Sequence, residues 1–305
     1  MQHDRLFKQL LSHFFFEFFE LFAPETAREA ERDSLIFLDK EAFLEEKRRE
    51  ADVVARLRVA GTDRLYLVHV EHQSRNEPDF ARRMFAYFSR LFDRYGCDVY
   101  PIALFSFRYP QSPQPEELRI AFPDLEPLVF RYRVIQLSRL PWQSYRVDNP
   151  VAAALMSRMR MKNRERPWVF LACLSLISRM KYLTPRDQSF LASFVGQSLR
   201  LTPEEEAVYH AELNRMDRED REAVLEFINP WEERGRAEGR QEGRQEGRQE
   251  GLQLAALALA ESQFGVPAPA LAERFSRLDS ERTLEVIRRL GSGMTLQQLE
   301  AFLEG

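Results

Sequence analysis

Apolar positions change their spacing along the chain, and this change predicts where helices give way to strands. Between residues 4 and 22 they recur every three or four positions, which is typical of one amphipathic helix that ends before Pro24. A second helix is predicted over residues 76–95, with Pro78 in its first turn and Gly96 after its end. Apolar runs of strand length are found at 35–38, 51–59, 65–73, 99–107 and 128–137. The order of helix, three strands, helix and strand predicts a mixed α/β fold with an α-β-β-β-α-β core.

Helix signals replace strand signals after residue 150, including the helix starts at Thr184 and Thr202. A Glu-Gly-Arg-Gln repeat of period four then follows. Each glycine costs a helix about 1 kcal/mol relative to alanine, but the apolar segment after it resumes without a stop signal, which favours a continuous helix over a mobile spacer. The sequence predicts four parts: an α/β domain at 1–145, a helical domain at 150–230, the repeat at 231–251 as linker or helix, and a small helical domain at 252–305.

Composition narrows the classes of protein that fit this pattern. The chain has 44 basic and 48 acidic residues and a net charge of −4, so a globally basic nucleic-acid-binding domain is not indicated. Its two cysteines, Cys97 and Cys173, exclude a disulfide scaffold and a cysteine-rich zinc module. No run of about 18 apolar residues is present, and the first residues lack the pattern of a secretory signal. We therefore expect a cytoplasmic protein with no membrane span.

The hairpin formed by the second and third predicted strands carries the candidate chemistry. A short loop centred between Gly61 and Thr62 makes the numbers of paired residues sum to 123, which places Asp52 opposite Glu71. Because side chains alternate along a strand, Gln73 joins Glu71 on the same face. Two facing carboxylates repel each other unless a cation or a proton lies between them.

These residue types fit a magnesium site. Hard oxygen ligands suit Mg²⁺, which keeps several waters and often takes substrate phosphates as further ligands. The alternative on spacing alone is that Asp52 and Glu71 end the hairpin in solvent, each beside an arginine such as Arg49. A slip of one residue in the register would also remove the site, because it moves one side chain to the other face.

Three segments together carry a resemblance to a known family. Asp4-x-x-Phe-Lys8, the strand after Asp52 and the string Val70-Glu-His-Gln-Ser74 before an arginine-bearing helix resemble the PD-(D/E)XK nuclease superfamily. The closest resemblance is to its transposase-like branch, the recombination-promoting nucleases (Rpn), which end in a small domain of unknown function. The resemblance implies a DNA endonuclease that uses Mg²⁺ or Mn²⁺, with Asp52, Glu71 and Gln73 as catalytic residues and the two carboxylates as metal ligands.

One position departs from the superfamily's general pattern, because Gln73 stands where most members place lysine, although glutamine is usual in the branch resembled. Glutamine orients a water but supplies no charge for the transition state. Lys8 is a candidate accessory source of that charge, and Asp4 a candidate outer-sphere contact to the metal. The alternatives are a solvated helix lysine and an aspartate that favours the helix dipole.

Other basic and imidazole side chains have simpler alternatives. Arg83, Tyr87 and Arg90 share one face of the second predicted helix, where they would contact DNA phosphates or form a solvated face. The basic stretch at 157–166 would follow a DNA backbone or be a solvated helix face. His69 and His72 point to opposite faces of their strand, so they do not share an ion and are expected to be packed or surface histidines.

Two functions remain open on the sequence alone. The first is a Mg²⁺-dependent endonuclease with DNA as its partner, linked to transposition or recombination. The second is a DNA- or protein-binding assembly module on a worn nuclease fold, with a homo-oligomer formed through its helical C-terminal tail. Gln73 and the negative net charge favour the second, and the two facing carboxylates favour the first.

Overall fold

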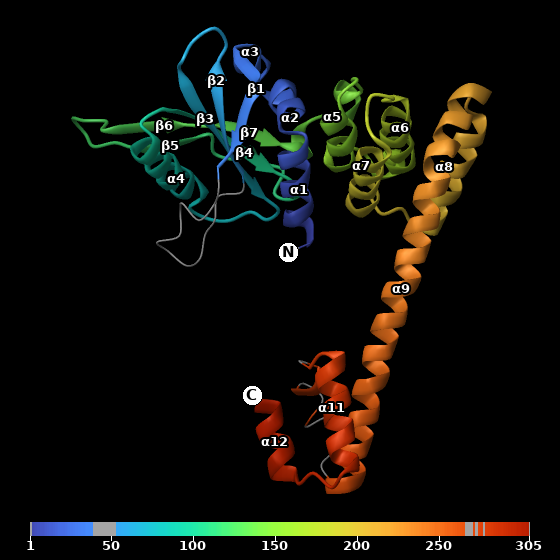
Figure 1. Cartoon of the computed structure of the whole chain (residues 1–305). Coiled ribbons are helices and arrows are strands. Elements are labelled where there is room, and N and C mark those ends of the chain that lie inside the picture. The colour runs from blue at the N-terminus through green and yellow to red at the C-terminus, as the bar shows by residue number, and fades with distance from the viewer. Residues whose placement is uncertain (1, 39–52, 266–270, 272–273, 277, 305) are drawn as a thin grey trace. The chain divides into compact units, whose positions relative to one another are not determined.

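The computed structural model describes residues 2–304 apart from 39–52, 266–270, 272–273 and 277, and it divides into two compact units, residues 1–228 and 229–305. The first unit has a mixed five-stranded sheet with the strand order β1-β2-β3-β4-β7, followed along the chain by helices (Figure 1). The mixed α/β fold expected from the sequence is confirmed.

The strands of this sheet are β1 (Ala30–Phe37), β2 (Val53–Val59), β3 (Leu65–Gln73), β4 (Asp98–Phe105) and β7 (Arg133–Gln136). β1, β2 and β3 pair in antiparallel fashion, whereas β4 lies parallel to β3 and β7 parallel to β4. Val53 pairs with Val70 and Leu57 with Tyr66. The predicted hairpin register, with paired numbers summing to 123, is therefore confirmed from Val53 onward.

Helices cover both faces of the sheet. On one face, α4 (Phe80–Tyr95) packs Phe80 and Met84 against a cluster that includes Ala103 and Phe105 of β4. On the other, α1 (Gln2–His13) stacks Phe7 on His72, and α2 (Phe15–Phe22) sets Phe19 against Tyr100. Figure 1 shows α4 and α1 on opposite sides of the strands.

The first predicted helix is interrupted. α1 ends at His13 and α2 begins at Phe15, because Phe14 leaves helical geometry at φ −118° and ψ 43°. α2 ends at Phe22, as the proline predicts, and Pro24 then opens a further short helix, α3 (Pro24–Arg28). The apolar stripe continues across the break, so its periodicity alone did not reveal the kink.

Two further expectations need correction. α4 begins at Phe80 rather than at Asn76, because a residue before proline disfavours helical geometry and Asp79 has a positive φ of 60°. The strand predicted at 128–137 is two strands: β6 (Leu128–Arg131) pairs with the unpredicted β5 (Glu117–Ile120), and β7 joins the main sheet. A period-2 pattern does not specify which strand is the partner.

The helices after residue 150 belong to the same compact unit as the sheet. They are α5 (Pro150–Leu155), α6 (Arg166–Arg179), α7 (Pro185–Ser198) and α8 (Pro203–Arg215). The predicted helix starts at Thr184 and Thr202 are confirmed, and each threonine is the N-cap of a capping box. The basic stretch at 157–166 is not one helix face, because it passes through two short 3₁₀ turns, η4 (Met156–Arg158) and η5 (Asn163–Glu165), before α6.

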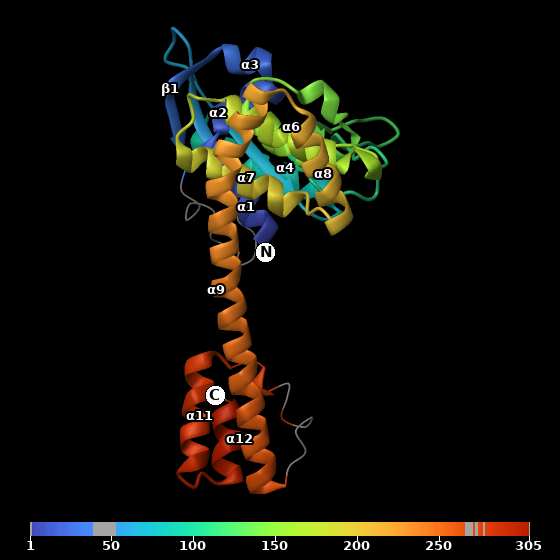
Figure 2. The ribbon, with the colours of Figure 1, turned by 90° about the vertical axis from the view of Figure 1, so that its right-hand side faces the viewer.

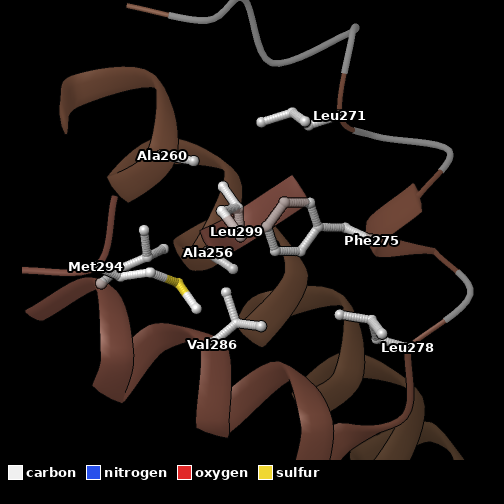
Figure 3. Close-up of a cluster of buried hydrophobic side chains, with 9 residues drawn as sticks. Ala256, Ala260, Leu271, Phe275, Leu278, Val286, Met294 and Leu299 are labelled. Carbon is white, nitrogen blue, oxygen red and sulfur yellow. The ribbon is translucent and has the colours of Figure 1, made fainter. Parts of the chain in front are cut away.

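The second unit is helical, and residues 229–264 of α9 (Arg218–Phe264) belong to it. α9 runs without interruption through the glycine repeat and into residues 252–260, which confirms the continuous helix. Its C-terminal part lies beside α11 (Ser280–Gly291) and α12 (Leu296–Glu304) (Figure 2). Ala256 and Ala260 of α9, Phe275, Val286 of α11 and Leu299 of α12 form the core of this unit (Figure 3). An added Cβ at Gly247 or Gly251 would meet open space, so these two glycines do not seal a close contact within the chain.

Candidate active site

The C-terminal half of β3 presents two sets of side chains to the two faces of the sheet. His69, Glu71 and Gln73 alternate with Val70 and His72, so the first three face α4 and the other two face α1. β3 is a central strand of the sheet, with β2 on one side and β4 on the other. This position buries the side chains of His69, Glu71 and His72. Asp52 and Arg49 lie outside the described residues, and Val53, paired with Val70, is the first residue of β2.

Glu71 is a buried carboxylate, with 4% of its surface exposed. Its Oε1 lies 3.7 Å from Nε of Arg83, and its Oε2 lies 3.5 Å from Nε2 of His69. Among the described residues, Oε2 has no hydrogen-bond partner. A buried acceptor left in this state costs free energy, so it indicates a ligand or water that completes the site.

Arg83 is the cation nearest to this carboxylate. Only 11% of its side chain is exposed, and it sits over the ring of Phe80 at 5.1 Å. Its Nη1 donates to Oε2 of Glu77 at 2.5 Å, in the loop before α4, while Nη2 has no hydrogen-bond partner among the described residues. Arg83 therefore lies between two carboxylates, and the N–H donors of its Nη2 are left for a further acceptor.

His69 is a member of the site that the sequence reasoning set aside. It is fully buried, its ring meets that of Tyr87 edge-on at 5.4 Å, and neither ring nitrogen has a hydrogen-bond partner among the described residues. The sequence pattern was considered only for an ion shared between His69 and His72, which lie three residues apart and on opposite faces of the strand. The informative spacing was two residues, which places His69 on the Glu71 face.

Gln73 stands at the end of β3, half-buried, on the face of Glu71. Its Nε2 donates to the backbone carbonyl of His72 at 2.9 Å, and its own carbonyl accepts from the backbone N–H of Ser106 at 2.9 Å. The backbone at this end is thus tied to β4. The side-chain amide of Gln73 is held against the backbone of its own strand by the hydrogen bond to His72.

The opposite face holds Asp4 and the second histidine. Nδ1 of His72 lies 3.7 Å from Oδ1 of Asp4, its Nε2 lies 2.8 Å from Oγ of Ser106, and its ring stacks on Phe7 at 4.0 Å. The structure therefore brings Asp4 to His72 and not to Glu71. Lys8 follows Phe7 in the same helix and is half-buried, and its accessory role stays a prediction.

The three candidate DNA contacts on α4 separate into two environments. Arg83 and Tyr87, one turn apart, turn toward the sheet and join the cluster around Glu71. Arg90 is exposed. A solvated arginine face, the alternative considered for these residues, does not describe Arg83 or Tyr87.

The donors at Glu71 fit a hard cation in part. A buried carboxylate with an unmade bond is the kind of ligand that Mg²⁺ and Mn²⁺ take. Over the part of the chain that the structure describes, no group of three His, Cys, Asp or Glu side chains is placed to hold a metal ion. Glu71 is thus one candidate ligand, and Asp52, the second ligand expected from the sequence, lies outside the described residues.

Comparisons with known proteins give one family match, in the N-terminal part of the chain. Residues 1–100 match the model of a family described as "Putative transposase, YhgA-like". No curated protein and no solved structure matches the chain. Within the described residues, no helix has the length and apolar character needed to cross a membrane. The N-terminal third, which carries the whole Glu71 cluster, is thus similar to a transposase-like family, and this similarity links the chain to transposition or recombination.

Proposed function

We propose that the chain is a metal-dependent DNA endonuclease that hydrolyses phosphodiester bonds during transposition or recombination. The observation that carries the proposal is the buried Glu71 carboxylate, whose Oε2 has no hydrogen-bond partner among the described residues. The match of residues 1–100 to a transposase-like family supports DNA as the substrate. Asp52 and Glu71 are the two metal-ligand carboxylates that the resemblance to PD-(D/E)XK nucleases implies.

Asp52 and Glu71 would hold the ion. The observed pairing begins at Val53 and Val70. The register expected from the sequence, in which paired numbers sum to 123, would place Asp52 opposite Glu71. A bound Mg²⁺ or Mn²⁺ would polarise the scissile phosphate and lower the pKa of the attacking water. Repulsion between the two acids in the absence of the ion favours its binding.

Gln73 and Arg83 divide the work that one lysine does in most of the superfamily. Gln73 would orient the attacking water through its amide, which requires its side chain to leave the carbonyl of His72. Arg83 would supply positive charge, because it lies on the Glu71 face and its Nη2 has no hydrogen-bond partner among the described residues. A fixed guanidinium stabilises the negative charge that develops on the phosphate in the transition state. Arg83 thereby becomes a stronger candidate for the missing charge than Lys8.

A second function is favoured by the way this cluster is partly paired. Nε of Arg83 lies 3.7 Å from Oε1 of Glu71, so the guanidinium balances the charge of Glu71 in part without a metal ion. Nε2 of His69 lies 3.5 Å from Oε2 of the same carboxylate. The amide of Gln73 is also held by backbone. Both contacts suit a binding or assembly module that has lost catalysis.

A plasmid-cleavage assay separates the two functions. Supercoiled DNA is incubated with the native chain in Mg²⁺ or Mn²⁺, with EDTA as the metal-free arm. Asp52→Ala is the test variant, and Asp63→Ala, an exposed carboxylate in the turn of the same hairpin, is the matched control. The endonuclease predicts nicking or linearisation by the native chain and by Asp63→Ala, and none by Asp52→Ala or in EDTA. Equal inactivity of all three proteins in both metals would favour the assembly module.

A further inference from the structure

A second cluster of arginines lines a small pocket beyond the end of β4. The pocket has a volume of about 80 Å³, and its walls come from the loop after β4, from η2 (Leu137–Arg139) and from the turns between α5 and α6. Arg108, Arg158 and Arg160 line it together with Tyr109, Ser138 and Asn163. No Asp or Glu is among its lining residues. Since one water needs about 10–15 Å³ of such volume, the pocket has room for one tetrahedral oxyanion.

Hydrogen bonds hold the walls of this pocket in place. Nε2 of Gln136 donates to the backbone carbonyls of Pro110 and Ser112 at 3.3 Å and 3.1 Å. Nη1 of Arg139 donates to the carbonyl of Gln111 at 2.8 Å. On the other side, the backbone N–H of Arg160 donates to the carbonyl of Leu140 at 2.8 Å. The pocket is therefore built before any ligand arrives, which lowers the cost of ordering it on binding.

The arginines gather here against their mutual repulsion. Burial lowers the pKa of Arg158, and the nearby charge of Arg108 lowers it further. Arg166, which also lines the pocket, is paired with Glu205 at 2.8 Å. Arg108 and Arg160 are exposed, so they can turn toward a ligand. Guanidinium groups match the oxygens of a phosphate with parallel N–H donors.

Ser138 gives an independent sign of a ligand. It is 6% exposed and lines the pocket, and its Oγ has no hydrogen-bond partner among the described residues. A buried hydroxyl in this state indicates a group missing from the site. A phosphate oxygen would accept the hydrogen bond that Ser138 leaves unmade.

The surroundings indicate a nucleic acid as the source of the phosphate. Tyr109, beside the arginines, exposes 76% of its surface. An exposed aromatic ring next to a cationic groove is how proteins stack unpaired bases while they hold the backbone. Arg108 follows Phe105, which pairs with Gln73, by three residues. Three extended residues span at most about 11 Å, so the pocket is close enough to Gln73 for one strand to reach both.

We propose that this pocket binds a backbone phosphate of a DNA strand whose neighbouring base is unpaired and stacks on Tyr109. The choice of DNA rests on the proposed function. The pocket holds the strand and takes no part in hydrolysis.

The test is binding of a fluorescent 20-nucleotide single strand, followed by anisotropy in EDTA so that no cleavage intervenes. The variants are the double variant Arg108→Gln with Arg160→Gln, and Tyr109→Ser. Arg146→Gln removes an exposed arginine outside the pocket and is the matched control. We expect the double variant to bind at least about 10-fold more weakly and to lower the salt slope by about 0.7, the value for one phosphate on a single strand. We expect Tyr109→Ser to lose about 5- to 100-fold on the single strand and less on a duplex.

Each other outcome overturns the proposal. Pocket variants that bind like Arg146→Gln would show that the strand runs elsewhere, and a native chain that binds no DNA would do the same. Inorganic phosphate that raises the melting temperature of the native chain but not of the double variant, with unchanged DNA affinity, would make this a free-anion pocket. Tighter binding of RNA of the same sequence would replace DNA as the partner. A native chain that cleaves no plasmid but whose DNA binding still depends on the pocket residues would show that the nuclease proposal alone had failed. A native chain that cleaves while the pocket variants bind like Arg146→Gln would show that this site alone had failed.

Discussion

The two faces of β3 carry neighbouring buried polar residues, His72 and Glu71, which differ in how far their hydrogen bonds are satisfied. On the α1 face, Nε2 of His72 lies within hydrogen-bond distance of Oγ of Ser106. Asp4 lies near its Nδ1, and the ring of Phe7 stacks on its ring. On the α4 face, Glu71 is equally buried, but its Oε2 has no hydrogen-bond partner among the described residues. Both side chains are buried, and they differ in hydrogen bonding: Glu71 has Arg83 and His69 within 3.7 Å, but its Oε2 makes no hydrogen bond among the described residues.

This difference separates a structural polar residue from a functional one. A satisfied buried group rigidifies the core, whereas an unsatisfied group costs stability and is retained where a ligand completes it. On the α4 face, both ring nitrogens of His69 and Nη2 of Arg83 also have no hydrogen-bond partner in the part of the chain that the structure describes. Under the proposed function, the α1 face therefore serves stability and the α4 face serves metal binding and cleavage.

Glu71→Gln should give the largest effect. Removal of a metal-ligand charge is expected to lower cleavage by more than about 10³-fold, beyond the 10²–10³-fold lost with one oriented donor. The melting temperature should stay within a few degrees, because Arg83 retains Glu77. His72→Gln, the matched change on the other face, should cleave within a few-fold of native. If both variants cleave equally, the two faces do not differ in function.

Phe7→Ala tests the α1 face. The ring is fully buried between His72 and Phe194, and truncation of such a ring costs about 3–5 kcal/mol of unfolding free energy. Urea denaturation measures that loss. Below the transition, the rate of cleavage per folded molecule should match native, and a rate loss comparable to that of Glu71→Gln would show that the α1 face also serves catalysis.

Gln73→Ala should lower cleavage about 10²–10³-fold, because one oriented hydrogen-bond donor is lost. Gln73→Lys should keep or raise the rate, provided the longer side chain reaches the same water. Single-turnover rates on plasmid DNA measure both. A Gln73→Ala variant as fast as native would make Gln73 a structural residue, and Arg83→Gln would then become the next variant to measure.

The smallest expected effect is on stability and concerns the contact between His13 of α1 and Asp187 of α7. Asp187 accepts from the Thr184 hydroxyl at 2.7 Å and lies 2.6 Å from Nε2 of His13. Burial raises the pKa of Asp187, but hydrogen bonds from Thr184 and His13 outweigh it and leave the pKa below its ordinary value. A depressed folded-state pKa contributes stability above the unfolded value, near 3.9, and loses it as pH falls through the folded value. Asp187→Asn should thus cost about 1 kcal/mol at pH 7 and progressively less below about pH 4, by urea denaturation across pH. A constant cost at all pH values would contradict the ionic contribution.

Much of this arrangement could be read from the sequence, because it follows from spacing. The hairpin register depends on a short loop, and the pairing of Val53 with Val70 bears it out. The helix through the glycine repeat followed from the apolar residues that resume after it. The start of α4 was predicted four residues too early, at Asn76. The sequence pattern gave no sign of the left-handed backbone conformation of Asp79, which precedes the first helical residue.

The parts that could not be predicted depend on distant segments. β5 is short and pairs only with β6 in a separate sheet, so local pattern gave no sign of it. The arginine pocket joins Arg108 to Arg158 across 50 residues, and only the folded chain places them together. His69 was accessible to sequence reasoning, since its spacing of two from Glu71 defines the shared face.

Manganese binding measured by electron paramagnetic resonance tests the central contrast most directly. The signal of free Mn²⁺ falls as the ion binds, so a titration counts sites without requiring cleavage. The native chain and His72→Gln are expected to bind one ion per chain at the same affinity, and Glu71→Gln none over the same range. A Glu71→Gln titration that overlays the native one would show that the unsatisfied carboxylate holds no metal and would contradict the account.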